Sequence, residues 1–301
     1  MKGSEVSLTP PIIFACGGNA DVRLPEPKSV RGFFIEHIVS REPELFSHIR
    51  IAENFKDWLN DSKYADLKTF EEDIAHISSL ILIFLESPGT IAELGLFATY
   101  DNLIDKLIIF VSEFHYSSDS FIKLGLLRYL SGKNEDIVRC YPWDDNNLKN
   151  TAKSVINDIS EDIKDLLSKH HKREVFQEEN PGHISFVIFE IILLFKALKY
   201  NEIMDSLECL GLCISKQKLN RFLFLLEKLG FISKKSYGSE FYYPLQKQSR
   251  VSLSLKDKTK KIDKSAITMA AMQFYMQEPK ERHRRRMLSS LLVSEDSGEK
   301  L

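Results

Sequence analysis

One stretch of the chain, residues 80–97, constrains the fold more than any other. Its first six residues are all apolar and partly β-branched, which is typical of a strand buried on both faces of a sheet. Ser87 is then a favourable N-cap, and Pro88 takes the first position of a helix, where its missing N–H costs nothing. The helix is therefore expected to begin at the carboxyl end of a parallel strand, where open α/β sheets bind ligands.

Two carboxylates mark this strand–turn–helix joint. Glu86 ends the apolar run, and Glu93 follows on the second turn of the helix, on the same face as Thr90. A carboxylate at the mouth of a sheet can attack an anomeric carbon, or it can stabilise the oxocarbenium ion that forms when a glycosidic bond breaks. The alternative is a capped helix with a solvated glutamate, because such joints are common in α/β proteins.

The segments on either side predict the rest of a first domain. Residues 11–15 form a strand after a polar lead-in, and residues 46–52 are a candidate second strand. Residues 106–111 are a further buried strand, which completes a right-handed strand–helix–strand unit. The predicted fold class is α/β, a Rossmann-like doubly wound parallel sheet over residues 1–173.

The loop after the first strand contains Cys16, Gly17 and Gly18. A doubly wound fold places this loop at the carboxyl edge of the sheet, near Gly89. Two adjacent glycines leave room for a phosphate or a ribose, or they make a plain tight turn. A second polar loop, residues 114–120, is expected at the next strand end.

A polar segment, residues 174–182, is the best candidate for a linker. Residues 183–250 then predict three helices followed by a hairpin, which is the order of a winged helix-turn-helix domain. Its cations suit phosphate contact, although docking of a protein is the alternative. On the recognition helix they are Lys216, Lys218 and Arg221, and on the wing Lys234 and Lys235.

Residues 251–301 form a charged, partly helical tail with a basic cluster at residues 282–286. Such a cluster contacts nucleic acid or is simply solvated. The formal net charge of the chain is −2, so no field of the whole molecule draws it to nucleic acid or membrane.

The cysteines and the apolar runs argue against a cysteine-bound metal site and against a membrane span. The four cysteines form no metal pattern, and Cys209 and Cys213 are expected to be buried in a reducing cytoplasm. The longest apolar run, residues 184–198, is interrupted by Glu190 and Lys196 and is not a membrane span. We therefore expect a cytoplasmic protein without a metal ion or membrane segment.

The joint at residues 86–97 resembles two related groups of proteins. Its Gly-Thr-x-x-Glu-x-Gly pattern is similar to the nucleophile segment of nucleoside deoxyribosyltransferases. Its Glu-Ser-Pro-Gly and Glu-Leu-Gly-x-Phe runs resemble still more closely the deoxyribosyltransferase-like effector of type II retron defence systems. The segments 12–18, 120–128 and 138–140 agree with the same effector.

The resemblance implies an N-glycosidase toxin with assigned site residues. Glu93 would be the nucleophile or would stabilise the oxocarbenium ion, and Glu86 would hold a ribose hydroxyl or orient Glu93. The substrate side would be shaped by Cys16, Gly17, Gly18, Ser87, Gly89 and Thr90. Glu71 has a counterpart in the effector, which leaves it either in contact with substrate or solvated on its helix. The substrate would be a nucleotide, with NAD the leading candidate, and no cofactor is expected.

The resemblance also implies partners. A reverse transcriptase and its multicopy single-stranded DNA (msDNA), with the retron non-coding RNA, would restrain a toxin that acts against phage by abortive infection. A homo-oligomer is expected as well. Two alternatives stay open, a nucleoside deoxyribosyltransferase and a non-catalytic nucleotide sensor with a DNA-binding winged helix. The housekeeping transferases have an Asp-x-Gly-Thr run where this chain has residues 86–90, which favours hydrolysis over base exchange.

Overall fold

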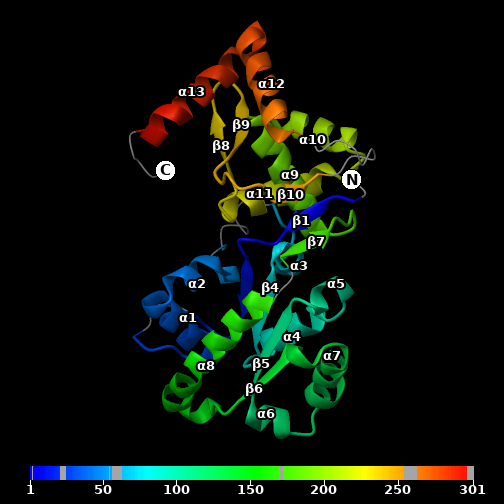
Figure 1. Cartoon of the computed structure of the whole chain (residues 1–301). Coiled ribbons are helices and arrows are strands. Elements are labelled where there is room, and N and C mark those ends of the chain that lie inside the picture. Colours follow the sequence, from blue (N-terminus) through cyan, green and yellow to red (C-terminus); the bar gives the residue numbers. More distant parts are fainter. Residues whose placement is uncertain are drawn as a thin grey trace. The chain divides into compact units, whose positions relative to one another are not determined.

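The computed structural model describes residues 1, 3–20, 25–53, 55, 63–169, 172–253 and 263–296. The chain folds into two compact units (Figure 1). The sheet unit contains Leu8–Asn60 and Asp66–Lys172, and the helical unit contains Met1–Ser7, Asp61–Ala65 and Arg173–Leu301. The two units are described separately below.

A five-stranded parallel sheet forms the centre of the sheet unit, with the strand order β3-β2-β4-β5-β6. Strand β2 lies between β3 and β4, so the chain crosses from one side of β2 to the other, as in a doubly wound fold. The predicted α/β class with a Rossmann-like parallel core is thus confirmed. The strands are β2 (Ile13–Cys16), β3 (Ile49–Arg50), β4 (Leu80–Phe84), β5 (Leu107–Ser112) and β6 (Val138–Tyr141).

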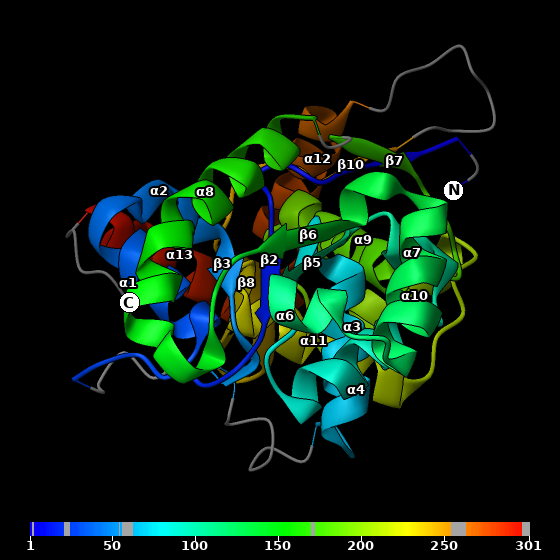
Figure 2. The ribbon, with the colours of Figure 1, turned by 90° about the horizontal axis from the view of Figure 1, so that it is seen from below.

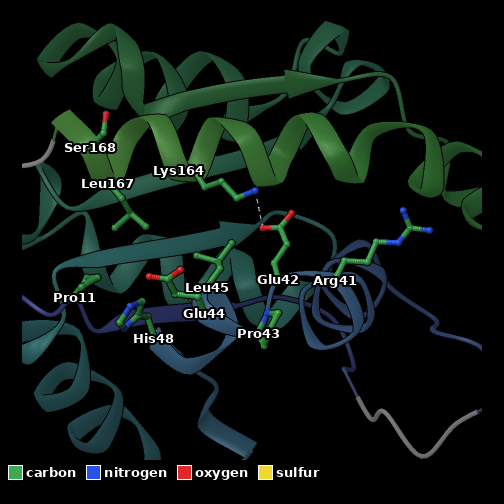
Figure 3. Close-up of a pocket in the computed structure, with 10 residues that line it drawn as sticks. All are labelled: Pro11, Arg41, Glu42, Pro43, Glu44, Leu45, His48, Lys164, Leu167 and Ser168. Atoms are coloured by element: carbon green, nitrogen blue, oxygen red, sulfur yellow. Dashed lines mark ion pairs between the residues drawn. The ribbon is translucent and has the colours of Figure 1, made fainter.

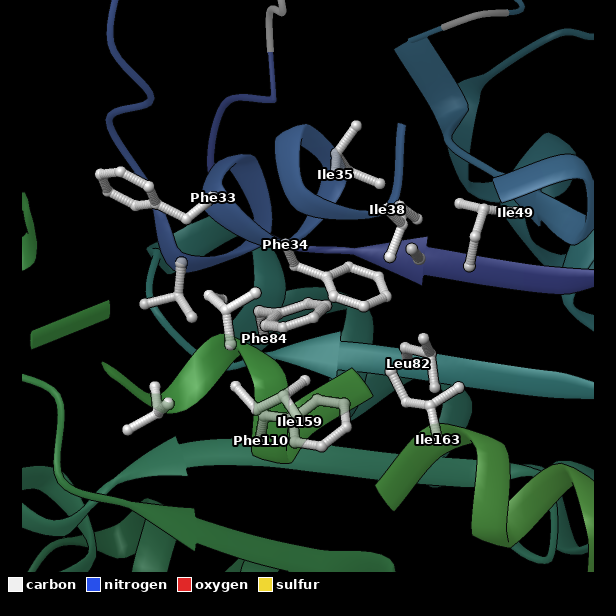
Figure 4. Packing of buried hydrophobic residues seen from close by; sticks show 14 of the residues in the cluster. Phe33, Phe34, Ile35, Ile38, Ile49, Leu82, Phe84, Phe110, Ile159 and Ile163 are labelled. Carbon is white, nitrogen blue, oxygen red and sulfur yellow. The ribbon is translucent and has the colours of Figure 1, made fainter. Parts of the chain in front are cut away.

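One face of this sheet is covered by α1 (Val30–Arg41) and α8 (Leu148–Lys169), which pack against each other (Figure 2). Alternate strand residues, such as Leu82 and Phe84 on β4, point into this layer. Figure 4 shows the rings of Phe34, Phe84 and Phe110 stacked between the sheet and the helices. This apolar layer holds the strand ends in fixed register.

The opposite face is covered by α3 (Leu67–Ile77) and α4 (Pro88–Phe97). Phe14, whose neighbours on β2 point the other way, meets Phe97 of α4 edge-on at 6.3 Å between ring centroids. Shorter helices complete the unit: α2 (Pro43–His48), α5 (Asp101–Ile104), α6 (Glu113–Ser117), α7 (Arg128–Lys133), the π-helix η2 (Ile122–Leu127), and the 3₁₀ turns η3 (Glu135–Ile137) and η4 (Asp145–Asn147).

Two local predictions in the sheet unit were wrong. The expected strand at residues 46–52 is reduced to β3, since residues 46–48 belong to α2; Pro43 stands at the start of this helix, where proline is favoured. Most of the expected loop at residues 114–120 is α6, which Ser112 caps by accepting a hydrogen bond from His115 N–H.

The helical unit contains three helices followed by a hairpin, in the predicted order. They are α9 (Pro181–Phe195), α10 (Tyr200–Cys209), α11 (Lys216–Lys228), β8 (Ile232–Ser236) and β9 (Glu240–Pro244). Ser215 caps α11, and Gly230 follows it with φ of 72°. The more specific winged-helix assignment stays a prediction.

A small antiparallel sheet in the helical unit has the order β10-β1-β7. Its centre is β1 (Glu5–Ser7), which pairs with β7 (Arg173–Val175) and with β10 (Val251–Ser252). The predicted polar lead-in therefore contains a strand, and so does the predicted linker. Short strands with few apolar residues carry too weak a pattern to be recognised alone.

The C-terminal segment forms α12 (Lys264–Gln277), the turn η5 (Pro279–Glu281) and α13 (Arg282–Asp296). Met287 of α13 joins a buried cluster with Ala197, Phe241 and Tyr243, so this helix packs against the hairpin. Arg284 is 2 % exposed and forms ion pairs with Glu202 and Glu281. The basic cluster at residues 282–286 is thus not uniformly solvated.

All four cysteines lie within the described residues, and all are free thiols. Cys209 and Cys213 are exposed, so the expectation that both are buried was wrong; they flank the turn at the end of α10. Among the described residues, no helix is both long enough and apolar enough to cross a membrane.

Candidate active site

The joint between β4 and α4 is formed as its sequence predicts. Ser87 Oγ accepts the backbone N–H of Thr90, and Ser87 N–H donates to Thr90 Oγ1 at 3.1 Å. Thr90 Oγ1 also donates to the Ser87 carbonyl, and Thr90 is 1 % exposed. The two hydroxyls therefore start the helix, and the Thr90 hydroxyl is already engaged within it.

Glu86 connects the end of β4 to the loop after β2. Its carboxylate accepts backbone N–H groups from Gly18 at 2.9 Å, Val30 at 2.6 Å and Arg31 at 3.1 Å. Burial raises the pKa of Glu86, while these hydrogen bonds oppose that rise. Both oxygens accept backbone hydrogen bonds, and the contact of Glu86 with a ribose hydroxyl stays a prediction.

The glycines of the loop after β2 are required by packing. A Cβ on Gly17 would stand 2.7 Å from the Arg31 side chain, and one on Gly18 would stand 2.7 Å from Ser29 and 3.2 Å from Glu86 Oε1. The space next to each glycine is therefore filled by protein. Gly89 differs, because the nearest atom to an added Cβ is Ser87 Oγ at 3.7 Å and the residue is exposed.

Arg31 lies beneath the loop and fixes its shape. The side chain, on the first turn of α1, donates to the carbonyls of Gly18 at 2.8 Å and Ala15 at 3.0 Å. It also forms an ion pair with Glu53. Only 2 % of Arg31 is exposed, so a positive charge is held inside the mouth of the sheet.

Glu93 points from α4 toward this charge and toward Cys16. The Cys16 thiol is hydrogen-bonded to the Glu93 carboxylate. The Oε2 atom of Glu93 is buried and has no hydrogen-bond partner among the described residues. Burial raises the pKa of Glu93, and Arg31 and Cys16 act against this rise. Burial also raises the pKa of the Cys16 thiol well above its usual value, so Cys16 stays protonated.

Glu71 of α3 belongs to the same cluster and is 6 % exposed. Burial, followed by the negative charges of Glu93 and Glu53, raises its pKa to about 8. The reading of Glu71 as a solvated helix charge is therefore wrong. The raised pKa keeps Glu71 protonated at neutral pH, next to Glu93, whose pKa is also raised by burial.

The two carboxyl groups have different surroundings, and such a difference is the pattern that separates acid and base roles within one site. A buried carboxylate oxygen without a partner is costly unless something else occupies it. Among the described residues, no group of three or more acidic, histidine or cysteine side chains could hold a metal ion.

A wide cleft of the sheet unit, of about 670 Å³, lies away from this cluster. Figure 3 shows it between α8 and the joint of α1 and α2, with the ion pair of Glu42 and Lys164 on its wall. Pro11, which precedes β2, also lines it, so it borders the amino ends of the strands. None of the predicted site residues is part of it.

The predicted basic residues of the helical unit have different surroundings. Lys216 is exposed, and Lys218 is half-buried with its ammonium 5.6 Å from the Phe222 ring. The Arg221 guanidinium lies 5.6 Å from the Tyr64 ring, and its contact with phosphate stays a prediction. Lys234 and Lys235 are neighbours on β8 and point to opposite sides of the hairpin, and Lys234 pairs with Glu240.

Comparison with known proteins agrees with the resemblance. Residues 27–235 match the family described as STM3845 retron effector protein. One relative, "Retron Ec86 putative ribosyltransferase/DNA-binding protein" of Escherichia coli, is 31 % identical over 160 residues, which cover 52 % of this chain and 47 % of the relative. The chain thus aligns with only about half of that protein's length.

A second relative, "Retron Ec73 putative ribosyltransferase/DNA-binding protein" of Escherichia coli, is 27 % identical over 255 residues. That alignment covers 78 % of each chain. The family match runs through both units, from α1 to β8. On this evidence, the chain belongs to the STM3845 family of retron effector proteins.

Proposed function

We propose that the sheet unit hydrolyses the N-glycosidic bond of a nucleotide, with NAD as the first substrate to test. The observation that carries the proposal is the buried Oε2 atom of Glu93, which no described group hydrogen-bonds. Further support comes from its place, at the carboxyl end of a parallel sheet, and from the ribosyltransferase names of two relatives.

In this mechanism Glu93 faces the anomeric carbon. As the bond between C1′ and the base nitrogen breaks, the base leaves with the electron pair, and the carboxylate bonds to C1′ or stabilises its positive charge. Water then adds to C1′ and releases a proton. Nicotinamide leaves NAD as a neutral molecule and needs no proton, whereas a purine or pyrimidine anion does.

The neighbouring groups position Glu93 in this proposal. Cys16 donates to one oxygen of Glu93, which directs the other toward the substrate. Glu71 keeps its proton near neutral pH and adds no second negative charge beside an anionic nucleotide. Glu86 and Arg31 hold the loop after β2 in shape, and the open face of Gly89 is left for the substrate.

We assign the second activity to the helical unit. Its three helices and hairpin suit a winged helix that contacts the msDNA and reverse transcriptase of a retron and so restrains a toxin that acts by abortive infection. Both relatives carry the words "DNA-binding" in their names. The exposed Lys216 on the first turn of α11 is the best placed of the predicted phosphate contacts.

The direct test uses purified full-length protein and NAD, with nicotinamide and ADP-ribose separated by chromatography. Glu93→Gln should lower the rate at least about 100-fold, because the amide cannot act as a nucleophile or stabilise a cation. Glu36→Gln, at an exposed position of α1, is the control and should keep full activity. Equal rates in both variants would refute the proposal.

Transfer to another base is the second candidate, favoured by the word "ribosyltransferase" in the relatives' names. Adding a labelled free base to the same assay separates the two reactions. A transferase would incorporate the label into a new nucleotide, whereas a hydrolase would produce ADP-ribose alone.

A further inference from the structure

A second cavity of the sheet unit, of about 300 Å³, lies at the carboxyl ends of β4 and β5. Its apolar walls come from four elements, and the polar side chains of Ser87, His115, Ser118 and Ser120 also line it. The apolar residues are Leu85, Pro88, Ile91, Val111, Ile122 and Leu127. Apolar walls with a few polar groups are the usual lining of a small-molecule site.

The cavity is separate from the cluster around Glu93 but adjoins it. Ile91 lines the cavity and Glu93 follows two positions later, so their side chains leave α4 about 200° apart. Gly89 stands four positions before Glu93, so it lies on the Glu93 side of α4, about one turn nearer the start of the helix. Glu86 borders both, since it lines the cavity and its carboxylate binds the loop that carries Cys16.

The size of the cavity limits what it can hold. A volume of about 300 Å³ is at the lower end of ligand pockets, which run from about 300 to 1,000 Å³, and suits one nucleoside rather than a dinucleotide. A dinucleotide with one nucleoside in this cavity would have to continue out of it. Pro88 lines the cavity and the next residue, Gly89, is exposed, so the start of α4 is the edge that such a molecule would cross.

The wall of the cavity formed by residues 120–127 has two unusual features. Ile122 and Leu127 belong to the π-helix η2, a distortion that occurs often at functional sites. Phe121, between two lining residues, is 87 % exposed, and its ring lies against Gly125. An exposed aromatic ring beside an apolar cavity is suited to stack on a base. His115 Nε2 is 2.9 Å from Asp145 Oδ2, which fixes the imidazole at the wall.

We infer that this cavity binds the nucleoside of a dinucleotide that does not react, while the other nucleoside is cleaved at Glu93. For NAD the bound half is adenosine. The inference rests on the proposed function for the identity of the substrate, whereas the existence of a nucleoside site can be tested without any catalysis. The inference defines the substrate class as dinucleotides. It also gives the apolar cavity a role beside the polar cluster around Glu93.

The test fills the cavity from α4. Ile91→Trp places an indole in it, and Ile91 is already 38 % exposed, so the core is not disturbed. Ala92→Trp, at the next and likewise exposed position outside the cavity, is the matched control. With NAD, Ile91→Trp should raise KM at least 10-fold; with nicotinamide mononucleotide, which lacks the adenosine, KM should change less than 2-fold. Ala92→Trp should change neither value.

A binding measurement keeps this test independent of catalysis. AMP is titrated by calorimetry into the Glu93→Gln protein, with and without Ile91→Trp. Loss of AMP affinity by 10-fold or more in the double variant supports the site, even if no nucleotide is hydrolysed and the proposed function fails. Equal AMP affinity, or an unchanged KM for NAD, overturns the inference and leaves the hydrolase proposal standing.

Discussion

Glu86 Oε1 lies 2.9 Å from the backbone nitrogen of Gly18, which places the two most distinctive motifs of the chain in direct contact. The same carboxylate also binds the first turn of α1. One acidic side chain at the end of the central strand therefore organises the loop and helix that surround Cys16 and Arg31. Its role follows from backbone geometry, independently of any substrate.

Replacing Glu86 with Gln should therefore destabilise the sheet unit. The amide keeps one acceptor oxygen but turns an NH₂ group toward backbone donors that also need acceptors. Leaving a buried donor unsatisfied costs about 1–3 kcal/mol, which should appear as a lower midpoint in urea unfolding. Glu36→Gln is the control. An unchanged midpoint for Glu86→Gln would show that the three hydrogen bonds contribute little.

Glu71 should make both stability and activity depend on pH. Its pKa is about 8 in the fold and near 4.5 when unfolded, so between these values the folded chain binds more protons. The contribution of Glu71 to stability is thus complete below pH 4.5 and is lost as the pH rises through about 8. Glu71→Gln, which resembles the protonated acid, should flatten this fall in thermal unfolding measured from pH 5 to 9.

In the assay with NAD, the same substitution should retain most activity at pH 7, because nicotinamide leaves without a proton. The fall of kcat/KM that we expect for the unmodified protein above pH 8 should disappear in Glu71→Gln. If activity is lost entirely at pH 7, then Glu71 takes part in the chemistry rather than in setting the charge of the site.

Substitution of the glycines of the site should affect stability at one position and substrate binding at another. Gly17→Ala forces a Cβ to within 2.7 Å of Arg31 and should lower the free energy of unfolding by about 1–3 kcal/mol, as overpacking does. Gly89→Ala meets no close atom and should leave stability intact while it raises KM for the nucleotide. Gly95→Ala, with nothing within 4 Å on the same helix, is the control for both measurements. Equal stability of the first two variants would contradict this division.

Arg284 should matter for folding and its neighbour Arg286 should not. The guanidinium of Arg284 is buried against Phe241 and Tyr275, pairs with Glu202 and Glu281, and donates to the Ala197 carbonyl at 3.0 Å. Removing one member of a buried ion pair costs about 3–5 kcal/mol, so Arg284→Ala should release α13. Hydrogen exchange should then accelerate in α13, whereas Arg286→Ala, at an exposed position, should leave it protected.

The sequence predicts the central joint well because its signals are local. The apolar run of β4, the cap at Ser87 and the proline at the first position of α4 each act within a few residues, and all appear as expected. The helices and the hairpin of the helical unit follow for the same reason. The retron effector family could be identified because residues 86–97 carry a specific motif.

The positions of the charged side chains in the site could not be predicted from local sequence signals. Arg31 reaches beneath a loop thirteen positions earlier, and Glu71 is buried near Glu93 and Cys16, which belong to other elements. The one sequence signal for Glu71 was its counterpart in the effector. The backbone hydrogen bonds of Glu86 and the capping role of Thr90 could not be predicted together with their proposed substrate roles, because the partners of Glu86 lie more than fifty positions away. The contact of Arg221 with Tyr64 was not predicted for the same reason.

The position of β1 has a consequence for how the protein is made. Residues Glu5–Ser7 leave the ribosome early, but their pairing partners, Arg173–Val175 and Val251–Ser252, are synthesised much later. The helical unit therefore cannot close its small sheet until most of the chain has been translated, whereas the sheet unit is complete by residue 172. A nascent effector would thus acquire its candidate cleavage centre before the module assigned to restraining it.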